Sequence, residues 1–68
     1  MDEEVFNSQL RKFLKKVGIQ SQREIEQAVR SSISAGTLDA TETLTSRVVL
    51  QVPVVGINVT IEDVIKLS

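Results

Sequence analysis

Two adjacent carboxylates are the residues of this chain closest to a catalytic arrangement. Glu62 and Asp63 lie in a segment where apolar and polar residues alternate, which predicts a β-strand. Successive side chains of a strand point to opposite faces, so the two carboxyl groups cannot act as a pair. Asp63 is expected to face Ser46 of a preceding strand and to hydrogen-bond to it. The carboxylates therefore predict a structural contact and no catalytic site.

Cysteine and histidine are both absent from the 68 residues. Their absence excludes disulfides, zinc sites with the usual ligands, and Cys–His or Ser–His nucleophile–base pairs. The three glycines are scattered and form no phosphate-binding loop. We therefore expect that the protein is not an enzyme and binds no metal or cofactor.

Basic residues form a second group that could do chemistry. Helical spacing places four of them opposite the apolar residues of the N-terminal segment: Arg11, Lys12, Lys15 and Lys16. With Arg23 and Arg30 they could contact the phosphates of a nucleic acid. The net charge is −1 and no aromatic residue is interleaved for base stacking, which favours a solvated face. Nucleic-acid binding is therefore the alternative function.

The elements that carry these residues begin with two predicted helices. The first should run from about 3 to 17 with Asp2 as its cap, and the second from about 22 to 35 with Gly36 as its stop. Each has apolar residues at three- and four-residue spacing. These are Phe6, Leu10, Phe13, Leu14 and Val17 in the first, and Ile25, Ala28, Val29 and Ile33 in the second.

The break between the two helices is predicted from three residues. Gly18 suits the left-handed position that ends a helix, because it has no Cβ to clash there. Ser21 and Glu24 have the spacing of a capping box, which begins a helix. A tight turn between two helices, followed by a hairpin, also resembles a winged helix-turn-helix. The second helix has acidic as well as basic residues and no third helix precedes the turn, so DNA binding is disfavoured.

The second half predicts an antiparallel hairpin, with strands at about 43–52 and 57–67 joined by Pro53–Gly56. If Val52 faces Ile57, the apolar residues of both strands share one face. The same register places Arg47 opposite Glu62 on the other face as a favourable charge pair. The expected fold is α+β, a single domain over residues 1–68, with two helices packed on one face of the hairpin (ααββ).

A two-stranded sheet has two open edges and is marginal alone. Val49 and Val64 add apolar side chains to the otherwise polar outer face, beside Arg47 and Glu62. We expect an edge to pair with a second copy of the chain or with a strand of a protein partner. The alternative is that residues 37–43 or the N-terminal residues cover an edge.

The location is predicted from what the N-terminus lacks. Residues 1–4 are acidic and precede no apolar run of the kind a signal peptide has. No segment approaches the roughly 18 apolar residues of a membrane span. We expect a cytoplasmic protein with no membrane contact.

Four segments resemble a family of short uncharacterised proteobacterial proteins, known as a domain of unknown function. They are residues 11–19 (RKFLKKVGI), 21–26 (SQREIE), 42–44 (ETL) and 52–56 (VPVVG). The resemblance implies a bacterial cytoplasmic protein and no activity. Relatives often carry lysine in the connector, where this chain has Thr37, Leu38, Asp39 and Ala40. That difference weakens a nucleic-acid function for the connector.

Overall fold

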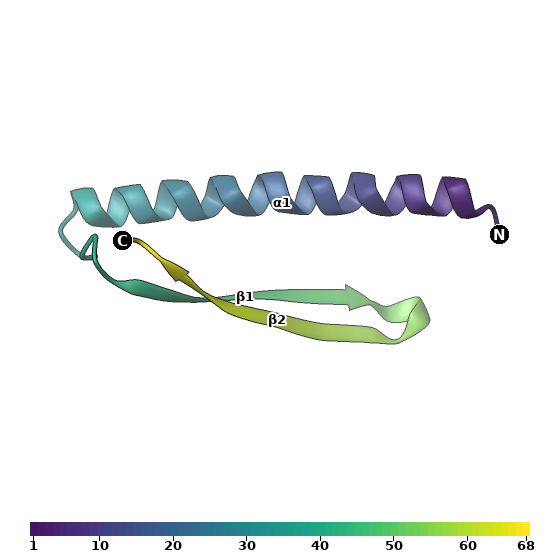
Figure 1. Ribbon diagram of the computed structural model, residues 1–68. Helices are drawn as coiled ribbons and strands as arrows, with labels where there is room; N and C mark the ends of the chain where they lie inside the picture. Colours follow the sequence, from purple (N-terminus) through teal and green to yellow (C-terminus); the bar gives the residue numbers. More distant parts are fainter. The chain divides into compact units, whose positions relative to one another are not determined.

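The computed structural model describes residues 1–68 and contains one helix and one β-hairpin (Figure 1). Helix α1 spans Glu3–Ser34, strand β1 spans Thr43–Val52, the 3₁₀ turn η1 spans Pro53–Val55 and strand β2 spans Ile57–Lys66. The α+β class is confirmed. The chain divides into two units, Met1–Thr37 and Leu38–Ser68, and each is described by itself.

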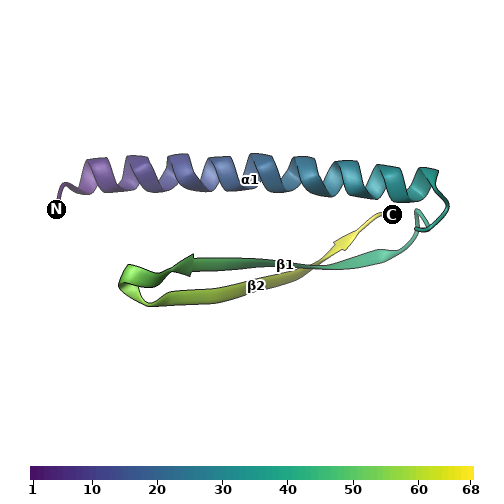
Figure 2. The ribbon, with the colours of Figure 1, turned by 180° about the vertical axis from the view of Figure 1, so that it is seen from behind.

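The prediction of two helices is wrong, because α1 continues without interruption from Glu3 to Ser34 (Figure 2). Gly18 lies inside it and does not have a positive φ. A glycine in a helix interior costs about 1 kcal/mol relative to alanine. Ending a helix and starting another would leave several backbone N–H and C=O groups without intrahelical partners. No proline separates the two halves, so continuation costs less.

Some apolar residues keep their phase across the predicted break. Leu14 and Ile25 are eleven residues apart, as are Val17 and Ala28. Eleven residues make about three turns at 3.6 residues per turn. One unbroken helix therefore places Ile25 and Ala28 on the same side as Leu14 and Val17, whereas Val29 and Ile33, about five turns beyond Arg11 and Lys15, turn away from that side.

Both ends of α1 are capped, as the sequence predicts. The Asp2 carboxylate accepts the N–H groups of Glu4 at 3.0 Å and Val5 at 3.1 Å. At the other end Gly36 has a φ of +76°, donates its N–H to the Ile33 carbonyl, and is followed by a Thr37 N–H···O=C Ser32 bond. These two bonds form a Schellman motif, which stops the helix.

The connector before β1 is held by Asp39. Its carboxylate accepts the hydroxyl of Thr41 at 2.7 Å and the N–H of Thr41 at 2.9 Å. Its carbonyl accepts the N–H of Glu42 at 3.1 Å. The hydroxyl bond from Thr41, followed by the N–H bond, holds the pKa of the Asp39 carboxyl below its ordinary value of 3.8. The connector is therefore an ordered turn.

The hairpin has the predicted register. Val52 pairs with Ile57, Leu50 with Val59, Val48 with Ile61, and Leu44 with Ile65. Gly56 closes the turn with a φ of +71° and donates its N–H to the Pro53 carbonyl. Because side chains alternate, one face is apolar except for Ser46 and Asp63, and we call it the inner face.

No residue of the chain is fully buried. On the inner face Val48 is 43% exposed and Ile61 is 59% exposed. On α1 the side chains of Phe6, Phe13 and Leu14 are about half exposed. Each unit thus carries an apolar face that burial against another surface would stabilise, at roughly 25 cal/mol per Å² covered.

Candidate functional site: the outer face and edges of the hairpin

The outer face of the hairpin carries the side chains that alternate with the apolar set. From β1 these are Thr43, Thr45, Arg47, Val49 and Gln51, and from β2 Asn58, Thr60, Glu62, Val64 and Lys66. Eight of the ten are polar or charged. The face is therefore that of a solvated sheet surface, interrupted by two valines.

An ion pair lies at the middle of the outer face, as predicted. Arg47 Nε donates to Glu62 Oε2 at 2.8 Å, and the two side chains are 63% and 51% exposed. Exposed pairs of this kind contribute about 0–1 kcal/mol. Its main consequence is to favour this register, since sliding one strand by one residue would place Arg47 and Glu62 on opposite faces of the hairpin.

The two valines flank this ion pair on opposite strands. Val49 lies opposite Thr60 and Val64 lies opposite Thr45, one same-face position to either side of Arg47 and Glu62. They are 58% and 53% exposed, which is more than Leu44, Leu50 or Ile65 on the inner face. Each valine lies next to a strand edge, where an added strand would cover it.

One hydrogen bond shows which backbone groups face those edges. The Leu67 N–H donates to the Glu42 carbonyl at 3.3 Å, one position beyond the Thr43–Lys66 pair. In an antiparallel pair, residues alternate between facing the partner strand and facing away. The residues of the outer face are therefore those whose N–H and C=O groups face away. Each edge presents about ten such groups.

Asp63 does not make the contact predicted for it. Its carboxylate accepts the N–H of Val64 at 2.7 Å, and Ser46, although directly opposite, is not its partner. The prediction of a Ser46–Asp63 hydrogen bond is wrong. An adjacent outward N–H is within closer reach of this short side chain than a residue across the ladder. The Val64 N–H, which points away from β1 toward the open edge of β2, is therefore already hydrogen-bonded.

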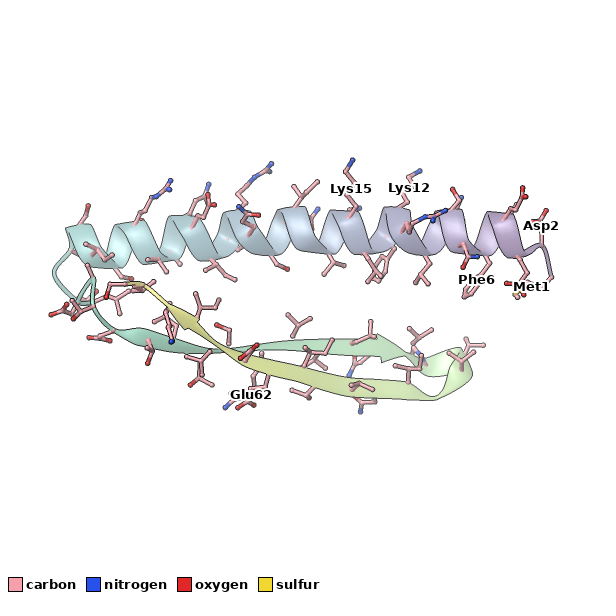
Figure 3. All side chains as sticks on the ribbon, in the orientation of Figure 1. Met1, Asp2, Phe6, Lys12, Lys15 and Glu62 are labelled. Carbon is pink, nitrogen blue, oxygen red and sulfur yellow. The ribbon has the colours of Figure 1, made fainter.

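The predicted basic residues gather because α1 is continuous. Lys12, Lys16, Arg23 and Arg30 recur at spacings of four and seven and lie along one side of the helix. An open depression is lined by Lys12, Lys15, Lys16, Ile19, Gln20 and Arg23. Figure 3 shows Lys12 and Lys15 on the side of α1 opposite Phe6. Arg11, about 100° around the helix from Lys12, lies apart from this line.

Sequence reasoning assigned the inner-face residues to a core and so passed over them as contact residues. Val48, Val59 and Ile61 are 43%, 48% and 59% exposed. Their alternation identified the face correctly, but alternation alone does not show what covers it. Their surface is available to a partner as much as that of Val49 or Val64.

The chain matches a known protein family. No curated protein matches the chain. No solved structure matches it. The helix α1 is not apolar enough over a sufficient length to cross a bilayer. A family model described as a family of unknown function, DUF6494, matches residues 1–68, and the chain therefore belongs to that family.

Proposed function

We propose that the protein is a small, non-catalytic interaction module of the bacterial cytoplasm. It associates with a second copy of itself through a free edge of its hairpin. The observation that carries the proposal is a pair of ten-residue strands that each have one hydrogen-bonded neighbour and one open edge.

The free edges favour association because of their length and composition. A ten-residue strand is longer than most edge strands, and β1 contains no proline that would prevent pairing. Threonine and valine, which favour strands, make up half of β1 and include Thr43, Thr45 and Val49 on the outer face. Adding a strand would satisfy backbone groups and cover one of the exposed valines.

The apolar faces give a second reason. The stripe of α1 formed by Phe6, Leu10, Phe13, Leu14 and Val17 is one such face, and the inner face of the hairpin is the other. Both surfaces are apolar and each is left partly exposed. A sheet formed by two hairpins would join their inner faces into one wider apolar surface.

Molar mass in solution tests the proposal directly. Light scattering with refractive-index detection suits a chain that has neither Trp nor Tyr. Across a dilution series the mass should rise from one chain to two. At least one of Val49→Lys and Val64→Lys should shift the midpoint to concentrations at least tenfold higher.

Val54→Lys is the matched control, because Val54 is 97% exposed in the turn and lies on neither edge. It should dimerise like the unmodified chain. A mass of one chain at every concentration would contradict self-association.

Nucleic-acid binding is the second candidate, and the continuity of α1 favours it. The unbroken helix aligns Arg23 and Arg30 with Lys12 and Lys16, which two helices joined by a turn would not do. If these four cations contact phosphates of a duplex, affinity should fall about 150-fold between 50 and 200 mM salt. Strand pairing should hardly change over that range, so a salt titration separates the two functions.

A further inference from the structure

We propose that the second copy adds to the edge of β1, forming an antiparallel sheet in the order β2–β1–β1–β2 with Val48 on the two-fold axis. This inference rests on the proposed self-association and specifies its edge and register. It follows from three observations on the hairpin.

The first observation distinguishes the two edges. At the β2 edge the Val64 N–H already donates to the Asp63 carboxylate at 2.7 Å. A strand added there must displace this bond and cover a carboxylate that has no cation partner. Covering an unpaired charge is costly. At the β1 edge no side chain accepts an outward N–H, and the charged residue, Arg47, is already paired with Glu62.

The second observation is the parity of the outward residues. In β1 these are the odd-numbered residues from Thr43 to Gln51. When two copies of β1 pair about a two-fold axis, each residue i faces a residue j of the other copy, and the sum of the two residue numbers is the same for every pair. Outward residues must face outward residues, because their N–H and C=O groups are the ones that point toward the added strand. The sum must therefore be even. Two even values of this sum, 94 and 96, pair nearly the whole of β1 with its copy.

The third observation selects between these two registers. A sum of 94 places Arg47 directly opposite Arg47 of the second copy, and like charges opposite each other are destabilising. A sum of 96 places Arg47 opposite Val49, whose side chain the aliphatic part of the arginine can cover. Val48 then meets Val48 on the inner face.

The selected register also ends naturally. Residues 44–52 of one copy pair with residues 44–52 of the other. The next position would place Thr43 opposite Pro53, which has no N–H to donate. Four outward residues from each chain, Thr45, Arg47, Val49 and Gln51, then make about eight hydrogen bonds. The two inner faces become one continuous apolar surface.

Single-cysteine cross-linking tests the inference, because the chain has no cysteine of its own. Val48 facing Val48 is a pair without mutual hydrogen bonds, with a Cα–Cα distance of about 4.5 Å, within reach of a disulfide. Val48→Cys should form a covalent dimer under mild oxidation. Ile61→Cys is the matched control, on the same face and directly opposite Val48 on β2. Its two copies would lie about 14 Å apart and stay unlinked.

The outcomes separate this inference from the function on which it rests. The molar mass of each variant is first measured by light scattering under reducing conditions. A dimer that cross-links through Ile61→Cys, or through neither cysteine, overturns the β1 register but leaves self-association intact. A monomer overturns both. With the β1 edge in use, Val49→Lys should weaken dimerisation at least tenfold, while Val64→Lys should leave it unchanged.

Hydrogen exchange on the unmodified chain provides a test without substitutions. The outward amides of Thr45, Arg47, Val49 and Gln51 should exchange more slowly as the protein concentration rises through the dimer midpoint. Those of Thr60 and Glu62 should not slow. Protection of the β2 amides in place of the β1 amides would overturn the inference.

Discussion

At the scale of single residues, short polar side chains determine where the elements begin and end. Asp2 caps the N-terminus of α1 and Asp39 holds the turn before β1. The carboxylate of Asp63 accepts an N–H at the edge of β2. All three carboxylates accept N–H groups one to three residues further along the chain. Local hydrogen bonds of this kind are favoured because the loop that must be closed is very short.

Asp39 provides a pH-dependent prediction. Its pKa is lowered, so its contribution to folding is present above pH 3.8 and is lost as the pH falls through the lowered value. The amide proton shift of Thr41, followed by NMR, should titrate with a midpoint below 3.8. Asp39→Ala should abolish the titration and speed exchange of the Thr41 amide. A midpoint at or above the ordinary value would contradict the Asp39–Thr41 bonds.

At the scale of elements, two glycines that both suggest a helix end have different roles. Gly18 lies within α1 with no positive φ, and no side chain lies within 4 Å of the position that a Cβ would take there. Gly36, in contrast, has a φ of +76°. The sequence predicted a helix end at both. Only the second is followed by the bonds that satisfy the last carbonyls, from Gly36 and Thr37.

These conformations predict opposite effects of alanine. Gly18→Ala should stabilise the protein by about 0.5–1 kcal/mol, because alanine favours a helix interior. Gly36→Ala should destabilise it by about 1 kcal/mol, because a Cβ disfavours the left-handed region. Thermal unfolding followed by circular dichroism measures both changes. Destabilisation by Gly18→Ala would support two helices joined at that residue.

At the scale of the whole molecule, the feature to explain is that no residue is fully buried. Small domains bury a limited share of their surface, and those with thin cores commonly depend on a disulfide, a metal or another subunit. With neither Cys nor His, this chain has neither of the first two in their usual forms. The proposed second copy would cover its exposed apolar faces.

Features that depend on neighbouring residues and on strand alternation could be predicted from the sequence. Asp2 and Gly36 mark the ends of the helical region, and the hairpin register follows from alternating apolar residues and the Arg47–Glu62 pair. The three-dimensional structure was needed to show that Gly18 and Ser21 lie inside one helix. It was also needed to show that Asp63 binds Val64 and not Ser46. A capping pattern in the sequence shows that a helix can end or begin at a residue. Whether the helix continues instead, and which hydrogen-bond partner a side chain takes, depends on the free energies of the competing arrangements.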